Sequence, residues 1–270
     1  MSRTSPAVRT ALITGATSGV GVEVAKRLAQ QQMLVLVHGR DEARGRKVVA
    51  DIEASGAKAS FLRADLASLD GVRALAKAVQ QQHPKLHLLI NNAGVGTGAP
   101  GSGREESADG FELRLAVNYL APVLLTRLLL PQLLAAAPAR IVNVASAGQR
   151  DIAFDDLQLN KRYSGQDAYC QSKLALIMVT FDLAEALKDR SIVVNTLHPA
   201  TYMDTFMVRQ AGHEPIGTVE EGADAIMHLA VAEEGTGQYF NGLRPARALA
   251  QAYDLSARER LRRVTAGLID

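Results

Sequence analysis

The alternation of short apolar runs with longer helical segments constrains the fold more than any other feature of this sequence. Five runs rich in apolar and β-branched residues recur, at residues 8–14, 34–38, 86–91, 140–145 and 192–197. Strands that alternate with helices predict a parallel sheet. Because these runs are apolar almost throughout rather than at every second position, we expect helices on both faces of the sheet. The sequence therefore predicts a doubly wound α/β fold.

Weaker segments complete this pattern. Further strands fit residues 59–63 and 238–240, and helical periodicity extends over 19–31, 42–54, 69–81, 110–134, 167–188 and 219–232. The sequence contains neither a Pro/Ser-rich linker nor a repeat of solenoid length, so we expect a single domain over residues 1–270. Loops at 95–103, 147–165 and 199–217 are expected to cover a site at the carboxyl ends of the strands, the last of them as a lid.

Charge and cysteine content indicate which partners fit. The chain carries 30 basic and 28 acidic residues, spread along its length, for a net charge of +2. This distribution argues against a nucleic-acid partner and favours a small-molecule substrate. Cys170, at a helical position that we expect to be buried, is the only cysteine. A single cysteine excludes an intramolecular disulfide and a cysteine-rich metal site, and it fits a reducing compartment.

The sequence shows no targeting signal. Its first ten residues contain no apolar stretch of signal-peptide length, and the apolar run around residues 128–130 is interrupted by Arg127 and Pro131. We therefore predict a cytoplasmic protein without a membrane span. No helix carries a pattern typical of a subunit interface, so the sequence leaves a monomer and a homo-oligomer both open.

A glycine-bearing turn follows the first predicted strand and opens a helix. The N-terminus of a helix offers unpaired N–H groups to a pyrophosphate, and glycine lets the backbone approach it closely. The alternative is an ordinary tight turn, but the strand–turn–helix setting favours phosphate binding. The residues that we expect to contact a dinucleotide here are Gly15, Thr17, Ser18, Gly19, Val20 and Gly21.

Tyr169 and Lys173 are one helical turn apart in a predicted helix, so their side chains project from the same face. A tyrosine with a pKa of about 10 is a poor acid or base near neutrality, and a neighbouring ammonium lowers an acid's pKa by about 1–3. The pair therefore predicts acid–base chemistry. The spacing alone also fits a surface lysine beside a half-buried tyrosine.

Four further motifs stand in order along the chain. They are Asp65-Leu66 after the third strand, Asn91-Asn92-Ala93-Gly94 at the end of the fourth, Asn118 in a helix, and Ser146 at the end of the next strand. Alone, Asp65 would fit a helix cap and Asn118 an ordinary helix interior. With the glycine turn and the Tyr169–Lys173 pair, they resemble the short-chain dehydrogenase/reductase family from Val8 to about Gly242. The resemblance implies a Rossmann-type fold and a nicotinamide dinucleotide cofactor.

The resemblance also implies a role for each motif. Tyr169 would donate the proton in carbonyl reduction, Lys173 would bind the nicotinamide ribose and lower the pKa of Tyr169, and Ser146 would position the carbonyl. Asn118 would support a proton relay. Hydride would pass between nicotinamide C4 and the carbonyl carbon. Further cofactor contacts are expected from Asp65, Leu66, Asn92, Ala93, Gly94, Pro199 and Thr201.

The end of the second predicted strand indicates the choice between NADP(H) and NAD(H). An acid at the position of Gly39 would accept hydrogen bonds from the ribose of NAD and repel a 2′-phosphate, but no acid stands there. Arg40 follows and can pair with a phosphate. We therefore expect NADP(H) to be favoured over NAD(H). The alternative is a solvated arginine neutralised by Asp41.

The chain departs from the compact family pattern at two places. An insert between Ser146 and Tyr169 resembles the retinol-dehydrogenase-like and protochlorophyllide-reductase-like branch, which favours lipophilic or polycyclic substrates. Within it, Tyr163 is not expected to be catalytic, because Asp167 stands four residues on.

The second departure follows the sixth strand, where Ala200 replaces the family's glycine and either Thr201 or Thr205 could contact the nicotinamide amide. The lid beyond it carries apolar residues that suit a lipophilic substrate or merely pack the lid onto the core. These residues are Met203, Phe206, Met207 and Val208.

The sequence thus predicts an NADP(H)-dependent oxidoreductase that interconverts a carbonyl compound and an alcohol. Two alternatives use the same fold. One is a non-catalytic dinucleotide-binding protein that senses redox state or acts as a scaffold, which would have little need for four catalytic residues together. The other is an epimerase or dehydratase that works through a transient ketone.

Overall fold

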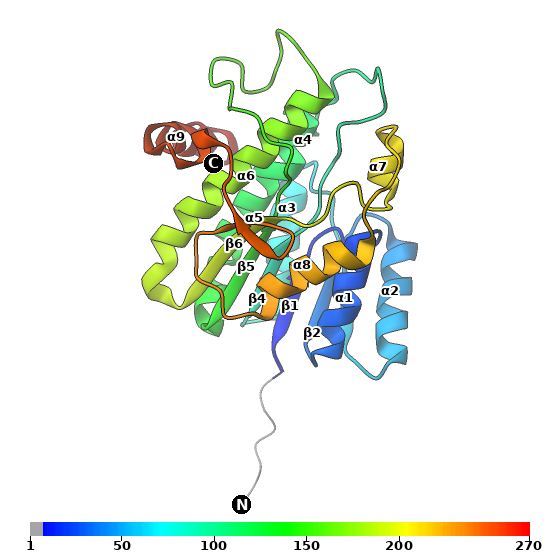
Figure 1. Cartoon of the computed structure of the whole chain (residues 1–270). Coiled ribbons are helices and arrows are strands. Elements are labelled where there is room, and N and C mark those ends of the chain that lie inside the picture. The colour runs from blue at the N-terminus through cyan, green and yellow to red at the C-terminus, as the bar shows by residue number, and fades with distance from the viewer. Residues whose placement is uncertain (1–7) are drawn as a thin grey trace, which may run out of the picture.

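The apolar runs form seven parallel strands of one sheet in a computed structural model, which describes residues 8–270 (Figure 1). The order in the sheet is β3-β2-β1-β4-β5-β6-β7-β8, and only β8 runs antiparallel to its neighbour. The doubly wound fold is confirmed, with β8 as an addition that the sequence pattern did not indicate. The strands are β1 (Thr10–Ile13), β2 (Leu34–Gly39), β3 (Ala59–Arg63), β4 (Leu88–Asn91), β5 (Ala139–Val144), β6 (Ile192–His198), β7 (Tyr239–Asn241) and β8 (Arg244–Ala246).

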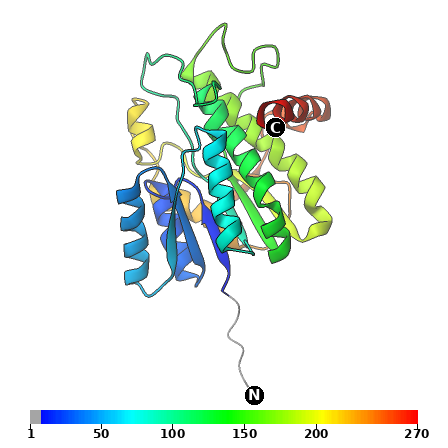
Figure 2. The ribbon, with the colours of Figure 1, turned by 180° about the vertical axis from the view of Figure 1, so that it is seen from behind.

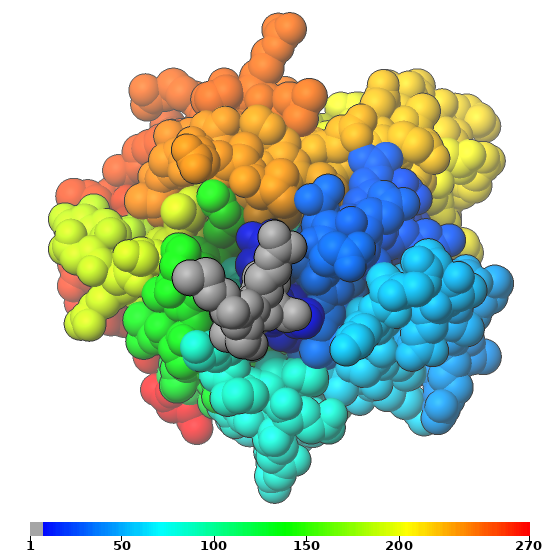
Figure 3. Space-filling view, turned by 90° about the horizontal axis from the view of Figure 1, so that it is seen from below, coloured from blue at the N-terminus to red at the C-terminus, as the bar shows by residue number. Residues whose placement is uncertain are grey.

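Helices cover both faces of the sheet because the strands are apolar on both sides. One face packs against α1 (Val20–Gln30), α2 (Glu42–Ala54) and α8 (Val219–Val231), and α8 lies along α1 in the view from below (Figure 3). The other face packs against α3 (Leu69–Gln82), α5 (Ala121–Ala136) and α6 (Gly165–Leu187), seen from behind in Figure 2. Each face has its own buried apolar cluster.

The strand order reverses between β1 and β4, and this reversal places the site. The chain runs outward from β1 to β3, crosses back to β4, and then runs outward in the other direction. The loops that leave the carboxyl ends of β1 and β4 therefore diverge and leave a crevice, which is where open α/β sheets bind ligands. The long loops after β4, β5 and β6 gather at this same edge, at the top of Figure 1.

The predicted helix over residues 110–134 is not one regular helix. It consists of α4 (Leu113–Leu115), a π-helical turn η1 (Ala116–Leu120) and then α5. Periodicity could not show this interruption, because residues 115–122 are almost all apolar and buried, so no polar face marks the one-residue shift that a π-turn introduces. Such turns are frequent at functional sites, and this one carries Asn118.

The chain beyond residue 242 forms structure that the sequence pattern did not predict. A helix, α9 (Leu255–Ile269), packs across α6, where Arg258 Nε donates to Asp182 at 2.8 Å. Its mixed polar sequence hid it, although Ala257, Leu261 and Ile269 join the apolar cluster on this side of the sheet. The remaining short segments are η2 (Lys188–Arg190), α7 (Phe206–Gln210) and η3 (Ala250–Tyr253).

One helical stretch, Leu113–Ala136, is long and apolar enough to cross a membrane by length and composition. In the structure 56% of its most apolar 18-residue window is buried, including Leu124, Leu129 and Leu133, whereas Leu134 is exposed. The predicted absence of a membrane span and the predicted cytoplasmic location stay predictions. The first ten residues, where we expect no signal peptide, include residues 1–7, which lie outside the described residues.

His38, at the end of β2, fixes the turn between β1 and α1. Its Nδ1 accepts from the backbone N–H of Gly15 at 3.3 Å, and its Nε2 lies 3.2 Å from the carbonyl oxygen of Ala64. These two contacts require the neutral ring with its proton on Nε2. Burial lowers the pKa of His38 from 6.5 to about 4, so the ring is neutral at physiological pH.

This histidine predicts a specific acid sensitivity. Because His38 has a lower pKa folded than unfolded, its neutral form contributes stability that is present above pH 6.5 and is lost as the pH falls towards 4. The difference corresponds to roughly 3 kcal/mol. Chemical denaturation at a series of pH values should show this loss in the wild type and not in His38→Gln. His213→Gln, which removes an exposed histidine from the lid, serves as the control and should keep the wild-type slope.

Candidate active site

The glycine turn is held against the end of β4 by Thr14. Its hydroxyl accepts from the N–H groups of Asn92 and Ala93, both at 3.0 Å, and lies 3.4 Å from the carbonyl of Ile90. The amide of Asn92 donates to the carbonyls of Thr14 and Gly15 at 2.9 and 3.2 Å. The Asn92 side chain therefore holds the turn in place, and its predicted contact with a cofactor stays a prediction.

The turn itself fits a pyrophosphate. Gly15 has a φ of 67°, and a Cβ there would lie 2.8 Å from the Cα of Ala93. A Cβ on Gly21 would lie 2.3 Å from the Gly15 carbonyl oxygen, so neither position has room for a side chain. Among the described residues, no side chain caps the N-terminus of α1, and Ser18 and Gly19 are exposed. The first N–H groups of α1 are thus free to bind an anion.

The other predicted cofactor residues differ in how exposed their side chains are. Arg40 and Asp65 are exposed at the ends of β2 and β3, with Arg40 Nη1 3.9 Å from the Asp65 carboxylate. Val20 and Leu66 pack their side chains into the core, so they offer only backbone groups. Thr17 fills the space beside Gly39, where a Cβ would lie 2.3 Å from Thr17 Cγ2. This contact is a physical reason for glycine rather than an acid at position 39.

Helix α6 brings Tyr169 and Lys173 to the edge of the crevice. The helix begins after Ser164, whose hydroxyl accepts from Asp167 N–H. The side chains of Tyr169 and Lys173 lie on the face of the helix toward β5. Lys173 Nζ donates to the carbonyl oxygen of Val144 at 2.8 Å and lies 5.7 Å from the centre of the Tyr169 ring. The predicted proximity of the pair is confirmed, and the lysine is buried rather than at the surface.

Burial dominates the titration of both groups. It raises the pKa of Tyr169, and contact with the Ser146 hydroxyl acts in the opposite direction. Burial also lowers the pKa of Lys173 to about 8. Lys173 Nζ donates to a backbone carbonyl and lies 5.7 Å from the centre of the ring, and the expectation that it lowers the pKa of Tyr169 stays a prediction.

Asn118 lies in the π-helical turn, where its amide holds the loop after β4. Its Oδ1 accepts from the N–H of Val95 at 2.7 Å, and its Nδ2 donates to the Val95 carbonyl and to Ser172 Oγ, both at 3.0 Å. The Ser172 hydroxyl in turn donates to the backbone carbonyl of Tyr169. A Cβ on Gly94 would lie 3.2 Å from Asn118 Oδ1 and 3.4 Å from Lys173 Nζ, so these groups face the same small space.

Ser146, which follows the end of β5, is positioned by two neighbouring residues and by one far along the chain. Its hydroxyl accepts from Gly148 N–H at 3.0 Å, and its carbonyl accepts from Gln149 Nε2 and Tyr239 Oη at 3.1 and 3.2 Å. A Cβ on Gly148 would lie 3.5 Å from Ser146 Oγ and 3.8 Å from the Tyr169 ring. Tyr239, Thr14 and His38 are positioning residues whose partners lie distant in sequence, whereas Gln149 acts on a residue only three positions away.

The two threonines that could contact the nicotinamide amide lie at different places in the segment after β6. Thr201 Oγ1 lies 3.0 Å from His198 Nε2, and it is exposed, whereas Pro199 is buried. Thr205 caps α7, and its Cγ2 lies 3.4 Å from where a Cβ on Gly19 would be. Thr205 therefore lies over the glycine turn, and Thr201 lies beside the end of β6.

The apolar residues of the lid do not act alike. Met203 packs onto the core near Gly222, and Met207 lies directly over Gly96 in the loop after β4. Phe206 is 77% exposed. Met203 therefore packs the lid onto the core, which is the alternative interpretation of these residues. Phe206 instead remains available to a ligand.

Cys170 is buried, as expected, and its Sγ accepts from Gln166 at 3.2 Å. Burial raises the pKa of this thiol, which keeps it in the neutral form. Within residues 8–270, no group of three or more histidine, cysteine, aspartate or glutamate residues is placed to hold a metal ion.

Comparison with known proteins agrees with this geometry. A model of the family described as short chain dehydrogenase matches residues 9–215. The chain is 36% identical over 274 residues to human retinol dehydrogenase 12, covering 96% of this chain and 85% of that protein. It is 39% identical over 279 residues to mouse polyprenol dehydrogenase, covering 94% and 81% of the two chains.

A solved structure supports the same assignment. A metagenomic short-chain oxidoreductase in complex with NADP superposes with a TM-score of 0.67 at 26% identity, covering 89% of this chain and 98% of that one. With the glycine turn, the Tyr169–Lys173 pair and the strand order already described, the family is established. The chain is a dehydrogenase/reductase acting on CH–OH or C=O groups, and it belongs to the retinol-dehydrogenase-like branch of the short-chain dehydrogenase/reductase family.

Proposed function

We propose that this protein is an NADP(H)-dependent reductase of lipophilic carbonyl compounds, or the corresponding alcohol dehydrogenase. The observation that carries the proposal is the arrangement at the carboxyl ends of β4 and β5. There Ser146, Tyr169 and Lys173 lie beside a glycine turn that fits a pyrophosphate. A bound nicotinamide dinucleotide supplies or accepts the hydride, and the protein supplies orientation and a proton.

The chain's own residues divide this work. The hydroxyls of Ser146 and Tyr169 both donate to a substrate carbonyl oxygen, which holds the carbonyl and stabilises charge that develops on it. Tyr169 then transfers its proton to that oxygen. A raised pKa suits a group that must stay protonated until this step. Lys173 returns a proton to Tyr169 and binds the ribose of the cofactor. Asn118 holds the loop at Val95 in a position that leaves space for Lys173 and Tyr169 to act.

Arg40 and the space around Gly39 support a preference for NADP(H). Arg40 is 73% exposed, and its contact with Asp65 is long, so the guanidinium is free to turn to a 2′-phosphate at little cost. Thr17 occupies the volume that an acidic side chain at position 39 would need. The site therefore lacks the acid that would reject the phosphate.

The walls of the crevice support a lipophilic substrate. Phe206 and Ile216 of the lid are exposed, and Met207 lies over the loop after β4. Exposed apolar side chains of this size at the mouth of a site favour an apolar ligand. The names of the relatives, retinol dehydrogenase and polyprenol dehydrogenase, point to long apolar alcohols as the first compounds to test.

Activity should require the hydroxyl of Tyr169. Turnover of a panel of lipophilic ketones and aldehydes is measured with NADPH by the change in nicotinamide absorbance. Tyr169→Phe should reduce turnover by about 10²–10⁴-fold because it removes the general acid, and cofactor affinity should be unchanged. Lys173→Met should reduce turnover and also weaken cofactor binding, and the two losses should not add. Near-normal turnover by a folded Tyr169→Phe would rule out the proposed acid.

Cofactor preference should depend on Arg40. Fluorescence titration should show NADPH binding at least tenfold more tightly than NADH, since a charge-assisted hydrogen bond contributes about 1.5–3 kcal/mol. Arg40→Ala should abolish most of this preference and leave NADH affinity unchanged. Arg46→Ala is the matched control. Arg46 is about as exposed as Arg40, at 74%, and its substitution removes the same charge from α2. Equal affinities in the wild type, or an unaltered preference in Arg40→Ala, would contradict the proposal.

Substrate affinity should depend on the lid. Phe206→Ala and Met207→Ala should each raise the KM for a long apolar substrate several-fold, with the cofactor dissociation constant unchanged, because each removes apolar contact area. Leu255→Ala removes an equally exposed apolar side chain, 73% against 77%, from the distant α9 and should leave KM unchanged. An effect on cofactor affinity alone would show that the lid residues contact the cofactor and not the substrate.

A further inference from the structure

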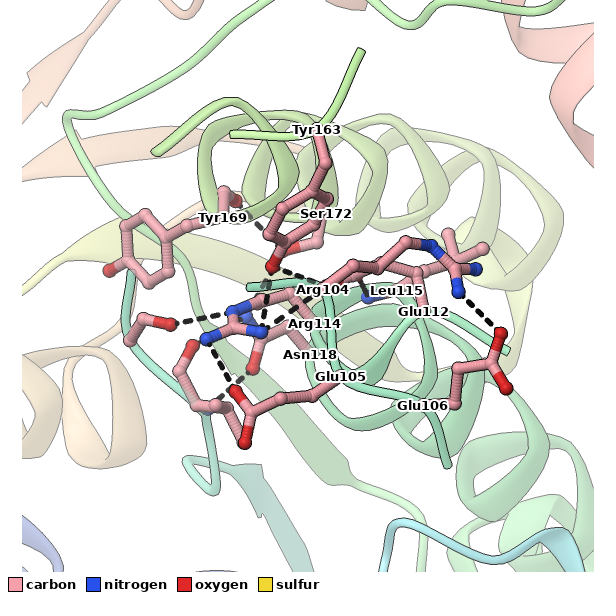
Figure 4. A network of polar contacts seen from close by, with 12 residues as sticks. Arg104, Glu105, Glu106, Glu112, Arg114, Leu115, Asn118, Tyr163, Tyr169 and Ser172 are labelled. Atoms are coloured by element: carbon pink, nitrogen blue, oxygen red, sulfur yellow. Dashed lines mark hydrogen bonds and ion pairs between the residues drawn. The ribbon is translucent and has the colours of Figure 1, made fainter. Parts of the chain in front are cut away.

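A buried arginine joins the loops on the substrate side of the crevice. Arg114, in α4, is 0% exposed. Its Nε donates to the carbonyl of Gly96 at 2.9 Å, and its Nη2 lies 2.9 Å from the carboxylate of Glu105. Its Nη1 donates to the Tyr163 hydroxyl at 2.8 Å (Figure 4). One guanidinium thus binds the loop after β4, the approach to α4 and the insert before α6.

Glu112 completes the network. It is 2% exposed, its Oε1 lies 3.5 Å from Arg114 Nη1, and it accepts from the Tyr163 hydroxyl at 3.3 Å. Its Oε2 accepts from the N–H of Leu115 at 2.7 Å and so begins the helix that leads into the π-turn of Asn118. The Tyr163 hydroxyl therefore accepts from the arginine and donates to the glutamate, which uses both of its hydrogen-bonding functions.

The insert is fixed at further points. Arg104 Nε donates to the carbonyl of Gln158 at 3.1 Å, and the side chain of Gln158 accepts from Glu112 N–H at 3.0 Å. Gln171, on α6, accepts from Ala153 N–H and donates to the Leu157 carbonyl, both at 2.8 Å. The insert is thus held from the α4 side and from the helix that carries Tyr169.

The loop after β4 is held at successive residues by side chains one helical turn apart. Asn118 binds both backbone groups of Val95, and Arg114 binds the carbonyl of Gly96. The next residue, Thr97, packs so closely on the first turn of α6 that a Cβ on Gly165 would lie 2.0 Å from its carbonyl oxygen. Figure 4 shows Arg114 between Tyr163 and Glu105, with Tyr169 on the neighbouring helix.

A buried charged network of this kind is a poor source of stability, because removing a guanidinium and a carboxylate from water costs about as much as their attraction returns. Its effect is geometric, since few alternative arrangements place so many donors and acceptors together. We propose that Arg114 and Tyr163 are positioning residues that join residues 95–98 and the insert 150–164 into one rigid wall, which orients the substrate carbonyl toward Tyr169. This inference rests on the proposed carbonyl-reductase function.

Tyr163→Phe tests the wall with the smallest change, because it removes one hydroxyl and keeps the ring. The kcat/KM of a carbonyl substrate from the panel should fall about fivefold to tenfold, and the fall should include kcat, because a carbonyl that is poorly oriented toward Tyr169 reacts more slowly once bound. The NADPH dissociation constant should not change. Arg114→Lys keeps the charge but not the fork of donors and should have the larger effect. Hydrogen–deuterium exchange should rise in residues 95–103 and 150–164 of both variants.

Tyr119→Phe is the matched control. It also removes one buried tyrosine hydroxyl, 2.7 Å from Thr265 Oγ1, but at the contact with α9. It should lower the melting temperature comparably and leave kcat, KM and exchange in both segments unchanged. If Tyr163→Phe matches Tyr119→Phe in kcat and in exchange, the proposed wall does not exist. If the wild type reduces no carbonyl compound with either cofactor, the proposed function fails and the orienting role falls with it, while exchange still decides whether the wall exists.

Discussion

The hydroxyl of Thr14 holds the end of β4 against the glycine turn, and the rest of the site depends on this contact. It fixes Asn92 and Ala93 beside Gly15, where the two backbones approach too closely for any side chain. The same contact sets where Gly94 and Val95 leave the strand. Asn118 then binds Val95, and the loop that bounds the crevice starts from a defined position. Glycine is required here by packing as much as by any ligand.

A buried chain of amides and hydroxyls extends this order across the sheet. Asn91 donates to Asn143 at 2.8 Å, which joins β4 to β5, and Asn143 donates to Thr180 at 2.8 Å, which joins β5 to α6. These hydrogen bonds are strong in the low dielectric of the core and costly to leave unmade. They fix the position of α6, which carries Tyr169 and Lys173, relative to β5, which Ser146 follows.

Burial, more than pairing, sets the charge states within the site. It lowers the pKa of His38 to about 4 and that of Lys173 to about 8, and it raises the pKa of Tyr169. Each direction favours the neutral form, as expected where water is excluded. A site built in this way keeps the tyrosine protonated and the turn at Gly15 intact at neutral pH. Lys173, with a pKa of about 8, still carries its charge at neutral pH, and further charged groups lie at the rim, at Arg40, and in the Arg114 network.

The sequence by itself determined the layers of the fold, the position of the glycine turn and the pairing of Tyr169 with Lys173. These features depend on hydrophobic periodicity and on short spacings within one element, which survive in any packing of the chain. Only the tertiary structure decided that Asn92 supports the turn, that burial raises the pKa of Tyr169, and that Tyr163 binds Arg114. It also decided the π-turn at Asn118 and the docking of α9. Each of these depends on partners distant in sequence and on exclusion of water, and neither is encoded in a local pattern.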